Sequence, residues 1–137
     1  MADSVACIAI KEGKILIAHR NPTGQMGGRW EFPGGKVDEG ENCEQAIARE
    51  MREEFGVKAE ACEKICEGEF FHNGKKNTLH AYEISLEHDG ISRPFALTEH
   101  TEYKWVTIGE IPTGNFVDSD LGIYEKVKNF VEKKISS

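Results

Sequence analysis

The sequence predicts an α+β protein in which helices cover the faces of one β-sheet. Short runs of β-branched and aromatic residues, separated by turn residues, occupy much of the chain and are typical of strands. Two segments, 43–55 and 126–135, instead carry apolar residues at helical spacing. The chain has 137 residues, of which 39% are hydrophobic, and is therefore long enough to bury a core of its own. We expect residues 1–137 to form a single domain.

The first predicted element is a β-hairpin. Ser4–Ile10 and Lys14–His19 are rich in aliphatic and β-branched residues, and Glu12-Gly13 lies between them at the place of a tight turn. A Gly-rich loop over residues 21–29 follows the hairpin.

The next motif combines a short strand with two glycines. Residues 30–32, Trp-Glu-Phe, predict the strand, and Pro33, Gly34 and Gly35 come directly after it. Because glycine has no side chain, this pair indicates backbone that bends sharply or approaches another group closely.

One helix is predicted over Cys43–Phe55. Asn42 and Gln45 have the spacing of a capping box, and Gly56 supplies a stop at the other end. Its apolar residues form a stripe that should face the core: Ile47, Ala48, Met51 and Phe55.

The rest of the chain predicts three strands and a second helix. Because Lys126–Ile135 carries apolar residues at helical spacing, a terminal helix that begins near Ser119 or Asp120 is expected. Asn73-Gly74 marks a turn between two of the strands. The strands are expected at Ala59–Phe71, Asn77–Leu86 and Tyr103–Ile108. Their aromatic residues are expected in the core rather than stacked on a ligand: Phe70, Phe71, Tyr82 and Trp105.

The charge balance excludes some partners. The chain carries 17 Lys and Arg against 24 Asp and Glu, a net charge of −7, so it should not bind a nucleic acid polymer. Its apolar runs are far shorter than the roughly 20 residues of a membrane span. Residues 1–4 lack the basic region of a secretory signal, and the four cysteines lack the spacing of a zinc site. We therefore expect a cytoplasmic protein with reduced thiols.

Three glutamates of the predicted helix lie on one side of it. Glu50, Glu53 and Glu54 are related by i, i+3 and i+4, and they border the apolar stripe. Clustered carboxylates repel one another unless a cation lies among them, and such hard oxygen ligands suit Mg²⁺ or Mn²⁺. An ordinary acidic surface helix is the alternative interpretation.

The flanking residues favour the metal site. From Gly35 to Val57 the chain resembles the Nudix box, G-x5-E-x7-R-E-U-x-E-E-x-G-U, in which U is a bulky aliphatic residue. The one departure is Met51 at an aliphatic position, which is nearly isosteric. The resemblance continues outside the box and implies a Nudix fold, an α/β/α sandwich around a mixed sheet. The matching polar and glycine positions are Gly35, Glu41, Arg49, Glu50, Glu53, Glu54 and Gly56.

The resemblance also implies the roles of several residues in hydrolysis of a nucleoside diphosphate derivative. Arg49 and Glu41 are expected to form an ion pair that orients the ligands. Glu53 and Glu99 are both candidates for the general base, which leaves the choice open. The catalytic cation is expected to be Mg²⁺, with Mn²⁺ able to replace it. Its implied ligands are the Gly34 carbonyl, Glu50, Glu53, Glu54 and Glu99.

The implied substrate is a small nucleotide. Arg20, Glu31, Phe32, Lys36 and Asp120 fall where MutT-type members of the family line the nucleotide pocket. The closest MutT pattern has Asn in place of Asp120, and an ionised Asp only accepts hydrogen bonds. This departure puts 8-oxoguanine specificity in doubt. An acceptor at Asp120 fits the N–H donors of cytosine or guanine.

The expected reaction is therefore hydrolysis of a normal, oxidised or otherwise modified nucleoside triphosphate to the monophosphate and pyrophosphate. Two alternatives remain. One is hydrolysis of ADP-ribose or a dinucleoside polyphosphate, although Asn73 stands where those branches tend to carry Pro or Tyr. The other is a Nudix-fold binding module without catalysis. The sequence leaves a monomer or a homodimer open.

Overall fold

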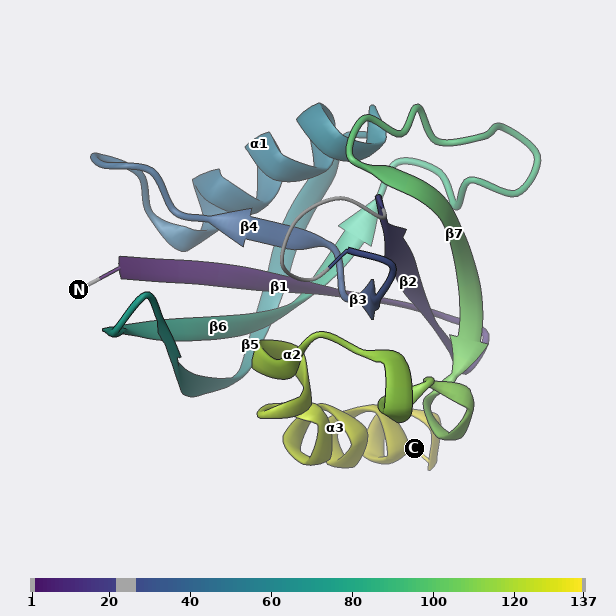
Figure 1. The fold of residues 1–137 in the computed structure, drawn as a ribbon. Helices are drawn as coiled ribbons and strands as arrows, with labels where there is room; N and C mark the ends of the chain where they lie inside the picture. The colour runs from purple at the N-terminus through teal and green to yellow at the C-terminus, as the bar shows by residue number, and fades with distance from the viewer. Residues whose placement is uncertain (1, 22–26, 137) are drawn as a thin grey trace.

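The computed structural model describes residues 2–21 and 27–136. In this part of the chain a seven-stranded mixed sheet lies between helices, which confirms the predicted fold class (Figure 1). The helices are α1 (Cys43–Phe55), α2 (Asp118–Leu121) and α3 (Tyr124–Ser136). The strands are β1 (Ala2–Lys11), β2 (Lys14–Arg20), β3 (Trp30–Glu31), β4 (Gly34–Lys36), β5 (Ala59–His72), β6 (Lys75–Leu86) and β7 (His100–Thr107).

Strand β1 is the axis of the sheet, whose order is β3-β2-β1-β6-β5. It pairs antiparallel with β2 and β4 and parallel with β6, from Ala2 opposite Asn77 to Ala9 opposite Ile84. Strand β7 pairs with β2 at the other side. The loop after β4 and the loop before β7 both contribute to the functional site described below.

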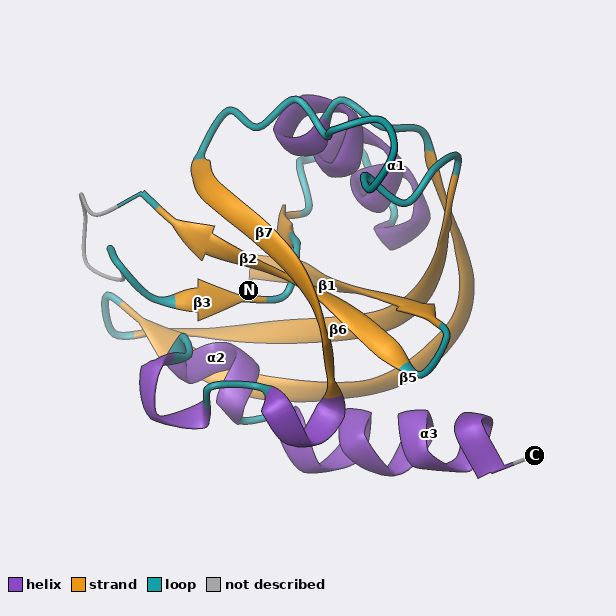
Figure 2. Ribbon diagram, turned by 90° about the vertical axis from the view of Figure 1, so that its right-hand side faces the viewer, coloured by secondary structure: helices purple, strands orange, loops and turns teal. Residues whose placement is uncertain are grey.

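Two core layers follow from the alternation of side chains along β1. Val5, Cys7 and Ala9 pack with α1 on one face, whereas Ala6 and Ile8 pack against α3 on the other. Figure 2 shows α1 above the sheet and α2 with α3 below it. The described helices include none long and apolar enough to cross a membrane.

Helix α1 has the predicted bounds because local signals set both of its ends. The Gln45 N–H donates to Asn42 Oδ1 at 2.8 Å, and the Asn42 N–H donates to Gln45 Oε1 at 2.9 Å. Gly56 ends the helix in the left-handed conformation, with φ of 63°. Of the predicted apolar stripe, Ile47, Met51 and Phe55 are fully buried, whereas Ala48 is only half-buried and Ala46 is buried in its place.

The C-terminal helix differs from the prediction. Residues 118–136 form two helices separated at Gly122 and Ile123. Ile123 is buried and packs so closely on β5 that a Cβ at Gly68 would lie 2.8 Å from its Cγ2 atom. The break therefore places an apolar anchor on the sheet and leaves α2 as a separate short turn.

Two further expectations needed correction. The residues Gly34–Lys36 form strand β4, which the glycine content concealed. Phe71 is 74% exposed near the tip of the β5–β6 hairpin, so its assignment to the core was wrong. Within the loop expected at 21–29, residues 22–26 lie outside the described residues.

Replacing Asn42 with Ala removes the acceptor for the Gln45 N–H. We expect the free energy of unfolding to fall by about 1 kcal/mol in urea denaturation. Arg52→Ala, at an exposed position of the same helix, is the matched control and should change it by less than about 0.5 kcal/mol. Equal losses in the two variants would contradict a specific role of the cap.

Candidate functional site

A cavity of about 610 Å³ lies where β4, the second half of α1, the loop before β7 and α2 meet. It brings together every residue that the sequence suggested as a metal ligand or substrate contact. These are Arg20, Glu31, Phe32, Gly34, Lys36, Glu50, Glu53, Glu54, Glu99 and Asp120. Segments distant in the sequence thus meet in one hollow, where the glutamates of α1 come from one face of the sheet and Asp120 of α2 from the other (Figure 2).

The glutamates of α1 reach the cavity at different depths. Glu50 is buried, Glu54 is half-buried, and Glu53 is exposed, as is Glu99 from the loop before β7. In residues 2–21 and 27–136, no three acidic, histidine or cysteine side chains lie close enough together to form a ready-made metal site. A cation bound here would have to draw these carboxylates together.

The electrostatics of this end fit such a cation. Burial raises the pKa of the Glu54 carboxyl well above its usual range, and a hydrogen bond to Glu50 raises it further. The charges of Glu50, Glu99 and Glu31 act in the same direction. Crowded carboxylate oxygens that repel one another are the donor set that hard divalent cations prefer.

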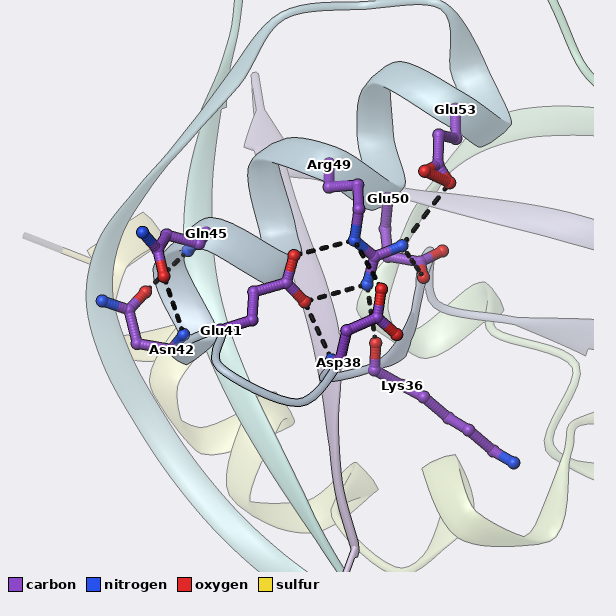
Figure 3. A network of polar contacts seen from close by, with 8 residues as sticks. All are labelled: Lys36, Asp38, Glu41, Asn42, Gln45, Arg49, Glu50 and Glu53. Atoms are coloured by element: carbon purple, nitrogen blue, oxygen red, sulfur yellow. Dashed lines mark hydrogen bonds and ion pairs between the residues drawn. The ribbon is translucent and has the colours of Figure 1, made fainter.

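Arg49 supplies a positive charge between Glu41 and the helix glutamates Glu50 and Glu53 (Figure 3). Its guanidinium donates to both oxygens of Glu41 at 2.8 and 3.0 Å, and to the Lys36 carbonyl at 2.9 Å. It also donates to Glu50 Oε1 at 2.9 Å and Glu53 Oε2 at 3.5 Å. Hydrogen bonds from Arg49, and from the Asp38 N–H, lower the pKa of Glu41 to about 2. Arg49 thereby fastens the 36–41 loop to the helix that carries the glutamates.

The two glycines of β4 explain how the loop fits between β1 and α1. Gly34 has a φ of 150°, and a Cβ there would lie 1.9 Å from the Val5 carbonyl oxygen. A Cβ at Gly35 would lie 2.6 Å from the carboxyl carbon of Glu50. The glycines thus permit a close approach, one of the two possibilities that the motif suggested.

The other end of the cavity contains one buried carboxyl group. Asp120 is 5% exposed, and its Oδ2 accepts the Phe32 N–H at 2.9 Å. Burial, followed by the charge of Glu31, raises the pKa of Asp120 well above its usual range, although the Phe32 N–H and Arg20 oppose this shift. Phe32 packs edge-on against Phe116, with ring centroids 5.1 Å apart. Phe32 and the buried Asp120 carboxyl thus line the same cavity, joined by the Phe32 N–H.

The loop before β7 is held against the end of α1. Thr98 donates from its hydroxyl to the Glu53 carbonyl at 3.1 Å and from its N–H to the Glu54 carbonyl at 3.3 Å. The Asn21 N–H donates to the Glu99 carbonyl at 3.2 Å. These bonds set the backbone from which the Glu99 side chain enters the cavity.

Sequence reasoning missed several wall residues. The only signal for Thr98 was its place directly before Glu99. Phe70 was expected in the core but is half-buried in the cavity wall. Leu79 of β6 lies in the same wall because β6 pairs with β5 at this point, with Leu79 opposite Gly68. Strand register, which the sequence does not state, decides such positions.

Comparison with known proteins agrees with this geometry. The family model described as NUDIX domain matches residues 1–127. The CTP pyrophosphohydrolase of Escherichia coli K12 is 32% identical over 125 residues, which cover 91% of this chain and 90% of that protein. The 8-oxo-dGTP diphosphatase of Haemophilus influenzae is 32% identical over 117 residues, which cover 85% and 83%.

Solved structures show the same fold. The solution structure of the E. coli ORF135 protein has a TM-score of 0.83 at 27% identity and covers 100% of this chain and 95% of that chain. The MutT protein of Methanosarcina mazei Go1 has a TM-score of 0.77 at 23% identity, with coverage of 97% and 94%. Enzymes of this family generally use a divalent metal ion. Because the family model and these relatives span most of the sequence, this chain belongs to the Nudix family of hydrolases.

Proposed function

We propose that this chain, as a single domain, hydrolyses nucleoside triphosphates to the monophosphate and pyrophosphate with Mg²⁺. The observation that carries the proposal is the cavity itself, with Glu50, Glu53, Glu54 and Glu99 at one end and the buried Asp120 at the other. A triphosphate could meet a cation at the first end while its base lies at the second. The names of the E. coli and H. influenzae relatives support this substrate class.

At the carboxylate end, Glu50, Glu53, Glu54, Glu99 and the Gly34 carbonyl would hold Mg²⁺, or Mn²⁺ in its place. When bound, the cation polarises phosphoryl oxygens and lowers the pKa of an attacking water. Glu53 and Glu99 are the proposed acceptors of the water proton, because both are exposed to the cavity. Glu50 suits this role less, since it is buried and bonded to Arg49.

At the other end, Arg20, Glu31, Phe32 and Lys36 are proposed to surround the nucleotide, with Asp120 reading the base. A protonated Asp120 offers both a donor and an acceptor, as the amide of Asn does. The raised pKa of Asp120 thus weakens the distinction from Asn made on sequence grounds. Both CTP-like and 8-oxo-dGTP-like bases fit such a group.

We also propose that the partners are small nucleotides rather than nucleic acid polymers, in a cytoplasmic protein. The net charge of −7 supports this, since the chain would repel a polyanion in the absence of a cation. A monomer and a homodimer are both compatible with a cavity built from one chain.

The proposed reaction is tested with a substrate panel. The protein, freed of metal with EDTA, should be inactive on CTP, dGTP, 8-oxo-dGTP and 5-methyl-dCTP, and added Mg²⁺ should restore release of pyrophosphate and monophosphate. ADP-ribose and dinucleoside polyphosphates complete the panel. Preference for these, or hydrolysis to a diphosphate and phosphate, would overturn the proposed reaction.

Replacing Glu53 with Gln keeps the size of the side chain but removes a charge from the metal end. We expect kcat to fall by about 10² to 10⁴-fold in a pyrophosphate-release assay, with an unchanged circular dichroism spectrum. Glu44→Gln, at an exposed position in the first turn of the same helix, is the control and should retain full activity. Activity of Glu53→Gln within a few-fold of wild type would refute the assigned role.

Asp120→Asn tests the burial of this carboxyl group through stability. An Asp whose folded pKa is raised favours folding most when it is protonated in both states, below about pH 4, and loses this advantage as the pH rises. Asn keeps an acceptor for the Phe32 N–H without a charge, so Tm should rise by about 3 °C or more near pH 7.5. Thermal unfolding should show the gain shrinking toward about pH 4. A gain independent of pH would contradict the raised pKa.

A further inference from the structure

The imidazole of His100 lies directly beside the cavity but has no role in the reaction proposed above. His100 is the first residue of β7, and its side chain is 2% exposed. Its ring stacks on Phe55 at the end of α1, with centroids 5.3 Å apart and an angle of 31° between the planes. A ring buried this deeply needs partners for its nitrogens. One of them has a partner, Glu31, which lines the cavity.

The Nε2 atom of His100 lies 2.7 Å from Glu31 Oε2. In the tautomer that carries hydrogen on Nε2, His100 donates this bond to the Glu31 oxygen. Glu31 also accepts from Arg20 Nη1, at 3.1 and 3.4 Å. A chain of contacts thus runs from His100 through Glu31 to Arg20, and its members come from β7, β3 and β2.

The bond to Glu31 matters more because the second ring nitrogen of His100 has no hydrogen bond in the described part of the chain. Nδ1 of His100 is buried and has no hydrogen-bond partner among the described residues. Among residues 2–21 and 27–136 the bond to Glu31 is therefore the one hydrogen bond of the ring, and its loss would leave both nitrogens buried without a partner. Buried charged pairs often add little net stability compared with apolar residues of similar volume, so a role in the neighbouring site is a further reason for this contact.

Two members of this chain of contacts, Glu31 and Arg20, border the functional site. Arg20 and Glu31 line the 610 Å³ cavity and also a neighbouring pocket of about 220 Å³, whose wall includes Glu99 and His100. His100 also lies opposite Arg20 in the pairing of β7 with β2. Within this wall, the position of Glu31 sets where the Arg20 guanidinium can lie.

We infer that His100 is a positioning residue for substrate binding: its Nε2–H holds Glu31, and through Glu31 it holds Arg20, against the nucleotide end of the cavity. The inference rests on the proposed nucleotide hydrolysis. It assigns His100 no contact with the substrate and no proton transfer. Its effect should therefore fall on KM rather than on kcat.

The test compares His100→Leu with His100→Gln in steady-state kinetics on the best substrate of the panel. Leu fills space beside Phe55 without a donor, so KM should rise about tenfold with kcat changed less than about threefold. Gln carries an amide N–H at about the reach of Nε2, so it should recover KM to within about threefold of wild type. His88→Leu is the matched control, since His88 also stacks on a phenylalanine, Phe95 at 5.2 Å, but lies outside the cavity wall.

A double-mutant cycle separates positioning from general stability. In the Glu31→Gln background, His100→Leu should raise KM by less than about twofold, because the group through which it acts is already altered. A full tenfold rise in both backgrounds, or an unchanged KM in His100→Leu, would overturn the inference.

Two further results complete the test. If His100→Leu does not fold, the KM values of His100→Gln and His100→Asn are compared instead, because the shorter Asn amide cannot reach Glu31. Equal KM values for these two variants would overturn the positioning role. A wild-type chain that hydrolyses no nucleotide would refute the proposed function itself. An active wild type with unaffected His100 variants would refute only the positioning role.

Discussion

The guanidinium of Arg49 is the interaction on which the site depends. It joins the 36–41 loop to α1 through Glu41 and the Lys36 carbonyl, while two other N–H contacts reach Glu50 and Glu53. Five donors in a rigid fork allow one side chain to make all of these contacts, which Lys could not do. The loop and the acidic helix therefore keep one relative position before any ligand arrives.

This arrangement depends in turn on the close approach of β4 to its neighbours. Gly34 lies so close to the Val5 carbonyl that a Cβ atom is excluded, and a Cβ at Gly35 would displace the Glu50 carboxyl. Glu50 can therefore be buried beside the backbone of β4 while it is bonded to Arg49. Backbone shape and charge pairing thus position the same carboxylate from opposite sides.

The sequence predicted the parts of the molecule that local signals determine. The bounds of α1 follow from Asn42, Gln45 and Gly56, which act within a few residues of each end. It did not predict β4 or the break before α3, because these depend on contacts of Gly34 with Val5 and of Ile123 with Gly68. The same limit applies to the site.

The motif placed the glutamates of α1, whose spacing is helical. The wall residues Thr98 and Phe70 and the positioning residue His100 come from other elements, so only the folded chain shows their proximity.

The two ends of the cavity differ in how their charges are balanced. At the α1 end, burial and the neighbouring glutamates still raise the pKa of Glu54 despite the contacts of Arg49 with Glu50 and Glu53, and this favours a divalent cation. At the other end, Glu31 is bonded to Arg20 and His100, and burial favours the neutral form of Asp120. An acidic protein can in this way accept an anionic nucleotide, since cation binding and local neutralisation each remove part of the repulsion.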